Sequence, residues 1–301
     1  MVEQPGHRPR PAAASGGAIS PVAGPASHRS SDARPAPAPD PAVLASRLTG
    51  RDRELCRLVW EHRVLTSAQC AELVFVSPVT ARHRLVILTN LRVLDRFRPP
   101  WPRGEGSAPW HYVLGPAGAA VLAAEQVTTV AQLGWRRDRA LGIAHSQHLA
   151  HQVGVNGFFT ALAAAARRRV DAALAVWWSE RRCTERWGQV IRPDGYGRWR
   201  QGGGEVDFFL EYDRGTENLG RLAGKLDGYA ELAAATRIAT PVLLWLPGPS
   251  REAAARQAIG QPPVPVATAT PVVGGPHPAG PVWLPAAQHG PRRQLVDLAR
   301  P

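Results

Sequence analysis

The sequence predicts an α+β protein with two folded units, and three observations lead to that prediction. A chain of 301 residues has the length of about two domains. Residues 44–134 hold three short amphipathic helical patterns followed by a pair of strand patterns. Residues 140–290 alternate between helical and strand patterns in the order αβββαβ. We therefore expect two structured domains, one at 44–134 and one at 140–290.

The ends of the chain lack such patterns. Residues 1–43 are rich in Pro, Ala, Gly, Ser and Arg, and such a segment buries too little apolar surface to offset its ordering entropy. We expect a disordered leader there and a tail at 291–301. No stretch reaches the roughly 18 apolar residues of a membrane helix, so no membrane partner is expected.

The charge of the chain predicts its partner. It has 36 Lys and Arg residues against 24 Asp and Glu residues, a formal net charge of +12. That excess indicates an anionic partner, and double-stranded DNA is the first expectation. The alternative is an arginine-rich proteome in which many proteins are basic. The three cysteines have neither zinc spacing nor the pattern of a disulfide framework, which fits a reducing cytoplasm.

The first unit begins with three capped helices. Thr49 precedes a helical pattern over RDRELCRLVWEHR. Thr66, with Gln69 three residues later, has the spacing of a capping box. Ser77 followed by Pro78 begins the third helix, because proline is favoured at the first helical position.

The third helix and the strands after it form the expected DNA-binding surface. Ala81, Leu85 and Leu88 recur at i, i+4 and i+7 and should face the core. Three helices followed by a hairpin predict a winged helix-turn-helix, in which the third helix enters a DNA groove and the hairpin is the wing. The side chains expected to contact DNA are Thr80, Arg82, His83, Arg84, Arg96, Arg98 and Arg103. The alternative is that this unit dimerises or docks a protein.

The second unit is predicted from five segments in order. They are a helix at 145–169, a strand at LAVWWSERR, a hairpin of two strands across 189–213, a helix at 217–236 and a buried strand at TPVLLWLPG. Thr216 is the expected cap of the second of these helices, and Leu222, Leu226 and Tyr229 form its buried face. The later segment GPVWLP is a candidate for a last strand.

Carboxylates converge on this scaffold. Asp194 follows Pro193 at the end of the second strand. Side chains alternate along a strand, so Glu211 and Asp213 share one face of the third strand. Two or three carboxylates at neighbouring strand ends suit a hard cation, and we expect Mg²⁺ or Mn²⁺. The alternative is a solvated turn that is rich in acids.

Lysine occurs once in the chain, at Lys225, two turns into the helix that follows. Its position at the border of the buried face lets the stem cross apolar surface and place the ammonium at the sheet edge. Beside a cation and a scissile phosphate, it would orient the nucleophile or stabilise charge in the transition state. The alternative is a chance surface lysine that pairs with Glu217 or Asp227. No GxxxxGK[ST] phosphate loop occurs, so ATP-driven helicase action is not expected.

This order of elements, with RPD followed by FLEYD, resembles the PD-(D/E)XK nuclease-like superfamily, whose restriction-endonuclease-like core is αβββαβ. The resemblance implies that Asp194 and Glu211 are metal ligands and catalytic residues, and that Asp213 is an accessory ligand. Asp213 stands where the superfamily places its lysine, so Lys225 on the next helix is the implied catalytic lysine.

Accessory roles are implied for two further acids. Glu217 would hold the helix or the lysine in place, and Glu180 on the first strand is a more remote candidate. His145, His148 and His151 lie close together on the first helix of this unit, and we expect them to contact phosphates or to be polar core residues rather than to form a metal site.

Across residues 49–290 the chain resembles the replication-relaxation family of actinobacterial plasmids and integrative elements. The segments that carry this resemblance are LTGRDRELCRLVWEHRVLTSAQ, RLVILTNLRVLDRFRP, HYVLGPAGA, HQVGVN, RPDGYGRW, FFLEYDRGTENLGRLAGKLDGYAEL and PVWLP. The resemblance implies a role in plasmid replication or DNA relaxation, with other replication or transfer proteins of the element as further partners. Two hypotheses follow. One is a metal-dependent nickase that binds DNA through its winged helix, and the other is a non-catalytic initiator or regulator with a degenerate nuclease-like scaffold.

Overall fold

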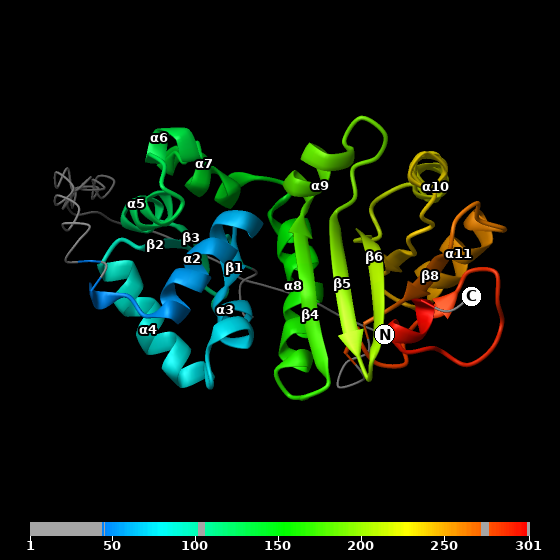
Figure 1. The fold of residues 1–301 in the computed structure, drawn as a ribbon, viewed down its shortest axis with the longest axis horizontal. Coiled ribbons are helices and arrows are strands. Elements are labelled where there is room, and N and C mark those ends of the chain that lie inside the picture. Colours follow the sequence, from blue (N-terminus) through cyan, green and yellow to red (C-terminus); the bar gives the residue numbers. More distant parts are fainter. Residues whose placement is uncertain (1–43, 45, 102–105, 272–276, 300–301) are drawn as a thin grey trace, which may run out of the picture. The chain divides into compact units, whose positions relative to one another are not determined.

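A computed structural model describes residues 44, 46–101, 106–271 and 277–299, all within one compact unit, Ala38–Pro301. The expected mixture of helices and strands is confirmed, and the strands form a three-stranded and a six-stranded sheet (Figure 1). The predicted leader lies outside the described residues, and the boundary between two domains stays a prediction. Among the described helices, none is both long and apolar enough to cross a membrane.

The first three helices begin where their caps predict. They are α2 (Gly50–His62), α3 (Ser67–Val74) and α4 (Pro78–Asn90). The side chains of Thr49 and Thr66 each accept a hydrogen bond from the backbone N–H three residues later and complete a capping box. Ser77 caps α4, and Ala81, Leu85 and Leu88 are buried as expected. These caps and this apolar stripe orient α4 against α2 and α3.

A small antiparallel sheet follows in the order β1-β3-β2. The predicted strand pair is present as β2 (Leu94–Phe97) and β3 (His111–Leu114), with Leu94 opposite Leu114. The third strand, β1 (Leu65–Thr66), has two residues and was not predicted, because so short a strand has no periodicity. The helices α5 (Pro116–Glu125), α6 (Val130–Leu133) and α7 (Arg137–Gly142) come next.

Helix α8 (Leu149–Ala166) contacts the N-terminal helices through side chains that bond backbone carbonyls. Asn156 Nδ2 donates to the carbonyl of Val64 at 2.6 Å and to that of His62 at 3.1 Å. The two Nη atoms of Arg167 donate to the carbonyl of Glu72 at 2.7 Å and to that of Phe75 at 2.8 Å. Because buried carbonyls need donors, these bonds join α8 to the segment of α2 and α3.

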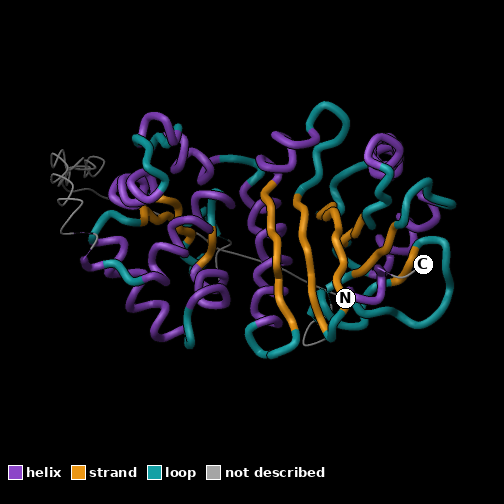
Figure 2. Tube along the Cα trace, viewed as in Figure 1, coloured by secondary structure: helices purple, strands orange, loops and turns teal. Residues whose placement is uncertain are grey.

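The six-stranded sheet has the order β4-β5-β6-β7-β8-β9 (Figure 2). The strands are β4 (Ala172–Ser179), β5 (Gly195–Gln201), β6 (Gly204–Tyr212), β7 (Val242–Trp245), β8 (Val266–Ala269) and β9 (Leu284–Pro285). Strands β4, β5 and β6 are antiparallel, β6, β7 and β8 are parallel, and β9 runs antiparallel to β8. Gly202 and Gly203 make the turn between β5 and β6 with φ of 57° and 80°, values that favour glycine. That turn places the start of β5 beside the end of β6.

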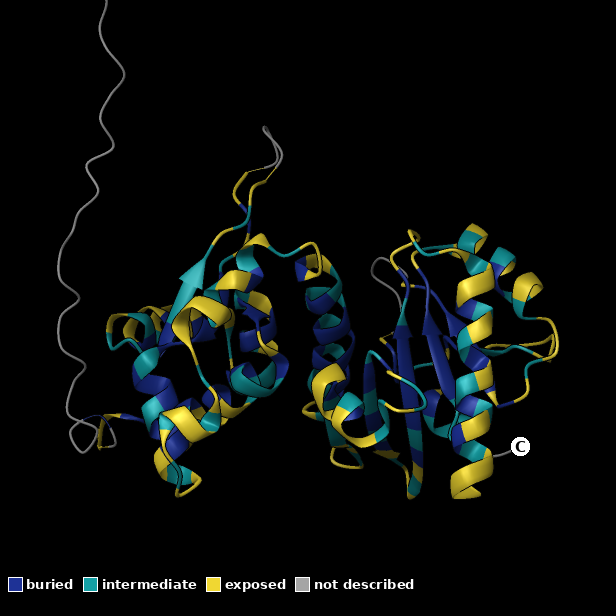
Figure 3. Ribbon diagram, turned by 90° about the horizontal axis from the view of Figure 1, so that it is seen from above, coloured by how far each residue is buried: buried dark blue, intermediate teal, exposed yellow. Residues whose placement is uncertain are grey.

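Helices cover both faces of this sheet. Helix α8 packs on one face, where Phe158 meets Phe208 in one buried cluster. Helices α10 (Leu219–Thr236) and α11 (Pro249–Ile259) cover the other face, where Phe209 and Tyr229 belong to a second cluster. Figure 3 shows the strands as the buried layer. The alternation expected along the third strand is therefore present in β6.

Three boundaries in this region differ from the prediction. The strand expected over LAVWWSERR ends at Ser179, whose side chain caps a short helix, α9 (Glu180–Trp187), so Glu180 begins a helix and does not lie on a strand. Asp194 directly precedes β5 and does not end a strand. The cap of α10 is Asn218, which accepts a hydrogen bond from Gly220 N, and not Thr216. Helix α11 and strand β8 were not predicted, because prolines interrupt both flanks of their patterns.

Candidate functional site

A buried acid–lysine cluster lies at the end of β6. Glu211 has a side chain that is 2% exposed, and it lies on the face of the sheet that α10 covers. Its Oε2 accepts a hydrogen bond from Lys225 Nζ at 2.8 Å, and its Oε1 accepts one from the Tyr229 hydroxyl at 2.6 Å. The lysine of α10 and the glutamate of β6, which are 14 residues apart in the sequence, therefore meet as the sequence predicted.

Asp194 joins this cluster from the start of β5. Its Oδ2 accepts a hydrogen bond from the backbone N–H of Tyr212 at 2.7 Å, and its Oδ1 lies 3.1 Å from His151 Nε2. Because Tyr212 directly follows Glu211, this bond places Asp194 beside the end of β6, where its negative charge helps to raise the pKa of both Glu211 and Lys225. The structure thus brings Asp194, Glu211 and Lys225 together. We name this set, with His151 and Tyr229, the acid–lysine cluster.

Two members of the cluster were missed as site residues. His151 was expected only to contact phosphate or to be a polar core residue, and no spacing in the sequence distinguishes it from His145 and His148. Its partner Asp194 becomes apparent only when α8 is seen to pack beside β5 and β6. Tyr229 was predicted to be buried, which is confirmed, but its hydroxyl bond to Glu211 had no sequence signal.

Burial and charge set the protonation of the cluster. Burial and, after it, the charge of Asp194 raise the pKa of Glu211 to about 7, although Lys225 and Tyr229 oppose the rise. Burial alone would lower the pKa of Lys225, but the carboxylates of Glu211, Asp194 and Glu217 together outweigh it and hold that pKa above its ordinary value. In the same way burial would lower the pKa of His151, but Asp194, with smaller contributions from Glu180 and Glu211, raises it. The cluster holds a charged lysine next to a glutamate that titrates near neutral pH.

The remaining predicted acids have other partners. Asp213 accepts a hydrogen bond from Arg251 Nε of α11 at 2.6 Å and another from Gly215 N at 2.7 Å. Glu217 lies with its Oε2 3.5 Å from Lys225 Nζ. Glu180 is exposed at the start of α9, and its charge helps to raise the pKa of His151.

This donor set does not fit a divalent cation in the arrangement that the structure shows. Mg²⁺ prefers six oxygen ligands, and it takes carboxylates that are free to coordinate. Both oxygens of Glu211 accept hydrogen bonds from Lys225 and Tyr229, and Asp213 is engaged by Arg251. Over the described ranges, no group of three or more His, Cys, Asp or Glu side chains is arranged to hold a metal ion.

A second candidate site is a groove of about 930 Å³ next to α3, the start of α4, the strands β2 and β3, and the end of α8. We name it the basic groove. Its charged and aromatic lining residues are Arg82, Arg96, Arg98, Arg167, Arg168, Glu72, Phe75, Trp110 and Tyr112. The Cζ atoms of Arg96 and Arg98 lie 4.1 and 4.2 Å from the centroid of the Trp110 ring, within the range of cation–π attraction. Trp110 thus holds two guanidinium groups at one wall of the groove.

The residues predicted to contact DNA are distributed over several positions. Arg82, Arg96 and Arg98 line the basic groove, and Thr80 and His83 are exposed on α4. Arg84 does not line the groove, and it donates hydrogen bonds to the buried Asp52 of α2 at 2.9 and 2.5 Å. Arg103 lies outside the described residues. Trp110, Arg167 and Arg168 line the groove without having been predicted, because only the packing of α8 and of the hairpin brings them there.

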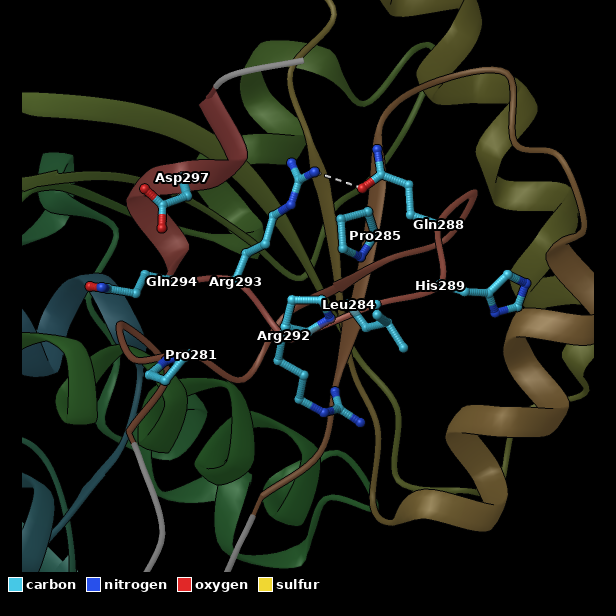
Figure 4. A pocket seen from close by; sticks show the side chains of 11 residues that line it. Pro281, Leu284, Pro285, Gln288, His289, Arg292, Arg293, Gln294 and Asp297 are labelled. Carbon is cyan, nitrogen blue, oxygen red and sulfur yellow. Dashed lines mark hydrogen bonds between the residues drawn. The ribbon is translucent and has the colours of Figure 1, made fainter.

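A smaller pocket of about 350 Å³ lies beside β9 (Figure 4). Its two arginines already have partners. Arg293 donates a hydrogen bond to Gln288 at 2.7 Å, as Figure 4 shows, and Arg292 forms an ion pair with Glu252 of α11 at 2.6 Å. These contacts tie the C-terminal segment to α11 and to the last strand, which is a structural role.

The fold and the two sites define an α+β protein that combines a basic groove with a buried acid–lysine cluster. The chain belongs to the replication-relaxation family, whose model matches residues 57–243. No curated protein and no solved structure matches the chain. The resemblance to this family is thereby confirmed over residues 57–243.

Proposed function

We propose that this protein binds double-stranded DNA in the replication or relaxation of a plasmid. The observation that carries the proposal is the basic groove. Arg82, Arg96, Arg98 and Arg168 line it, and within the described part of the chain no carboxylate forms an ion pair with any of them. Guanidinium groups that are not neutralised by the chain itself are suited to bind phosphates.

The elements around the groove support a winged helix-turn-helix. Helix α4 follows α3 after a short connection, and β2 and β3 form an antiparallel pair beside it. In that class of fold the second helix of the pair enters the major groove and the strand pair contacts the backbone. Here α4 would read the bases, while Arg96 and Arg98 on the strand β2 and just after it would bind phosphates. Other replication or transfer proteins of the element are proposed as further partners.

Salt dependence of duplex binding tests this proposal. If the four arginines each neutralise one phosphate, the logarithm of the binding constant should fall with the logarithm of salt concentration with a slope of roughly −3 to −4. Fluorescence anisotropy with a labelled duplex, repeated over a series of NaCl concentrations, measures that slope. A protein that fails to bind duplex DNA at low salt would contradict the proposal, and so would binding that does not change with salt.

Mg²⁺- or Mn²⁺-dependent nicking of DNA is a second candidate function. The observation that favours it is the meeting of Asp194, Glu211 and Lys225, the three residues expected for a nuclease-like site. The hydrogen bonds that occupy Glu211 favour instead a non-catalytic scaffold, because a cation would have to compete with Lys225 and Tyr229 for its oxygens.

A plasmid assay separates these two functions. Supercoiled plasmid is incubated with Mg²⁺ or with Mn²⁺, and the relaxed form is measured for the wild type, Glu211→Gln and Lys225→Arg. If the protein is a nickase, the wild type should relax the plasmid and neither variant should do so. Lys225→Arg should be inactive because arginine keeps the charge of Lys225 but not its compact ammonium. Supercoiled plasmid left intact by all three proteins, each of which still binds DNA, would identify the scaffold.

A further inference from the structure

Helix α4 displays apolar side chains that the core does not use. Val79 is 59% exposed, Val86 39% and Ile87 44%, and Val76 just before the helix is 85% exposed. The other large hydrophobic side chains that are exposed in the described ranges lie singly, at Trp101, Val127, Val170 and Ile238. Single exposed apolar residues are common on protein surfaces, but a group on one helix marks a contact surface.

The exposed side chains form two rows along α4. Val79, Arg82 and Val86 follow the spacing i, i+3, i+7, and Thr80, His83 and Ile87 repeat that spacing one residue later. Residues with this spacing lie above one another on a helix, so the two rows make one continuous face. The buried side chains Ala81, Leu85 and Leu88 hold the opposite face against the core. The face with the two rows is therefore open to a partner, and Arg82 and Val86 at one side of it also line the basic groove.

The charge of α4 and of the groove beside it indicates which partner binds this face. Helix α4 contains no Asp or Glu, and Arg82 stands between Val79 and Val86 in the same row. The basic groove borders the same helix and adds further positive charge. An anionic partner with small apolar groups fits this combination, and in duplex DNA the apolar groups of the major groove are the C5 methyl groups of thymine.

We propose that α4 selects A·T base pairs, with Val79 and Val86 packing on thymine methyl groups in the major groove. This inference rests on the proposed DNA binding and adds the class of sequence that is bound. Val79 and Val86 are seven residues apart, and a rise of about 1.5 Å per residue separates them by about 10 Å along the helix axis. That distance is about three base-pair steps of roughly 3.4 Å, so both valines can contact methyl groups of one site.

Removing only the methyl group tests the proposal. Binding is measured for a duplex of A·T pairs and for the same duplex with uracil in place of thymine. The wild type should bind the uracil duplex about tenfold more weakly, because two apolar contacts are lost. The double variant Val79→Ala/Val86→Ala should bind both duplexes with equal affinity. The matched control Val127→Ala/Val170→Ala removes two exposed valines elsewhere and should keep the tenfold preference.

A second pair of duplexes adds the methyl group at the same position of another base. A G·C duplex should gain affinity for the wild type when its cytosines carry a C5 methyl group, and the gain should be absent in Val79→Ala/Val86→Ala. Wild-type binding that is equal for thymine and uracil would overturn the inference and leave DNA binding standing. A wild-type protein that binds none of these duplexes would instead overturn the proposed function. The wild type could also prove to be a dimer that the substitutions Val79→Ala/Val86→Ala dissociate without changing the base preference. That result would identify α4 as a contact surface for a second copy of the chain and would also overturn the inference.

Discussion

The variant Lys225→Met is expected to lower the free energy of unfolding by about 3 kcal/mol at pH 8, because it leaves a buried carboxylate without its cation. Glu211 is 2% exposed and receives two hydrogen bonds, of which Lys225 supplies the charged one. Asp194 is close by and adds repulsion once the ammonium is gone. The value is at the lower end for buried pairs because the lysine side chain itself is 30% exposed.

The loss should be smaller at pH 6. Burial raises the pKa of Glu211 in the folded protein to about 7, above its ordinary value of 4.5. An acid whose pKa is higher in the folded state holds more protons there, so its contribution to stability falls as pH rises from about 4.5 through 7. Without Lys225 the pKa of Glu211 rises further, so at pH 8 the folded variant must either protonate this carboxyl or hold its charge unpaired. At pH 6 the carboxyl is already largely protonated in both proteins and depends less on the lysine. Urea unfolding of the wild type and Lys225→Met at both pH values measures this difference.

The double variant Lys225→Met/Glu211→Gln is the control for this prediction. Removing both charges leaves no unpaired carboxylate, so most of the lost stability should return. If the double variant is as unstable as Lys225→Met, the lysine stabilises the protein by packing and not through Glu211. A loss that is the same at pH 6 and pH 8 would also contradict the expected role of the charge.

The variant Arg96→Gln/Arg98→Gln should bind duplex DNA about 100-fold more weakly at low salt. Each charged hydrogen bond to phosphate contributes on the order of a tenfold change in affinity or more, and the two side chains are held side by side on Trp110. The slope of the salt dependence should fall in magnitude by about 2, because two phosphate contacts are lost. Anisotropy titrations of wild type and variant give both values.

The matched control is Arg136→Gln/Arg169→Gln, which removes the same charge from two exposed arginines that pair with Asp138 and Asp171. It should change affinity by less than about threefold, since those arginines lie outside the basic groove and are already neutralised. Equal losses in both double variants would mean that net charge, and not the groove, determines binding.

Local chemistry made much of the fold predictable. Thr49, Thr66 and Ser77 cap helices because their side chains bond backbone N–H groups within the same turn, a property that the sequence alone contains. The alternation along β6 fixed the face of Glu211 in the same way. Boundaries were less certain where two local patterns compete, as at Ser179, where an extended apolar run is followed directly by a helix cap.

The candidate sites depend on contacts between distant segments, and only part of each was predictable. Lys225 was identified because it is the single lysine and because its place on α10 faces the sheet edge. His151 lies on α8 and the groove residue Arg168 lies in the turn just after it. Nothing in their own neighbourhoods indicates that α8 packs beside β5 or ends at the basic groove. The sequence therefore indicated the charged residues of a site more readily than the neutral or distant residues that complete it.

The hydrogen bonds from α8 to backbone carbonyls decide where this chain can be divided for experiments. A fragment that stops near residue 140 would contain α2, α3 and α4 but neither Asn156 nor Arg167. The carbonyls of His62 and Val64, whose bonds to Asn156 are buried, would lose their donor, and buried carbonyls without donors destabilise a fold. The more exposed bonds from Arg167 to the carbonyls of Glu72 and Phe75 would be lost as well. A fragment meant to isolate the DNA-binding half should therefore extend past Arg167, so that it carries the whole of α8.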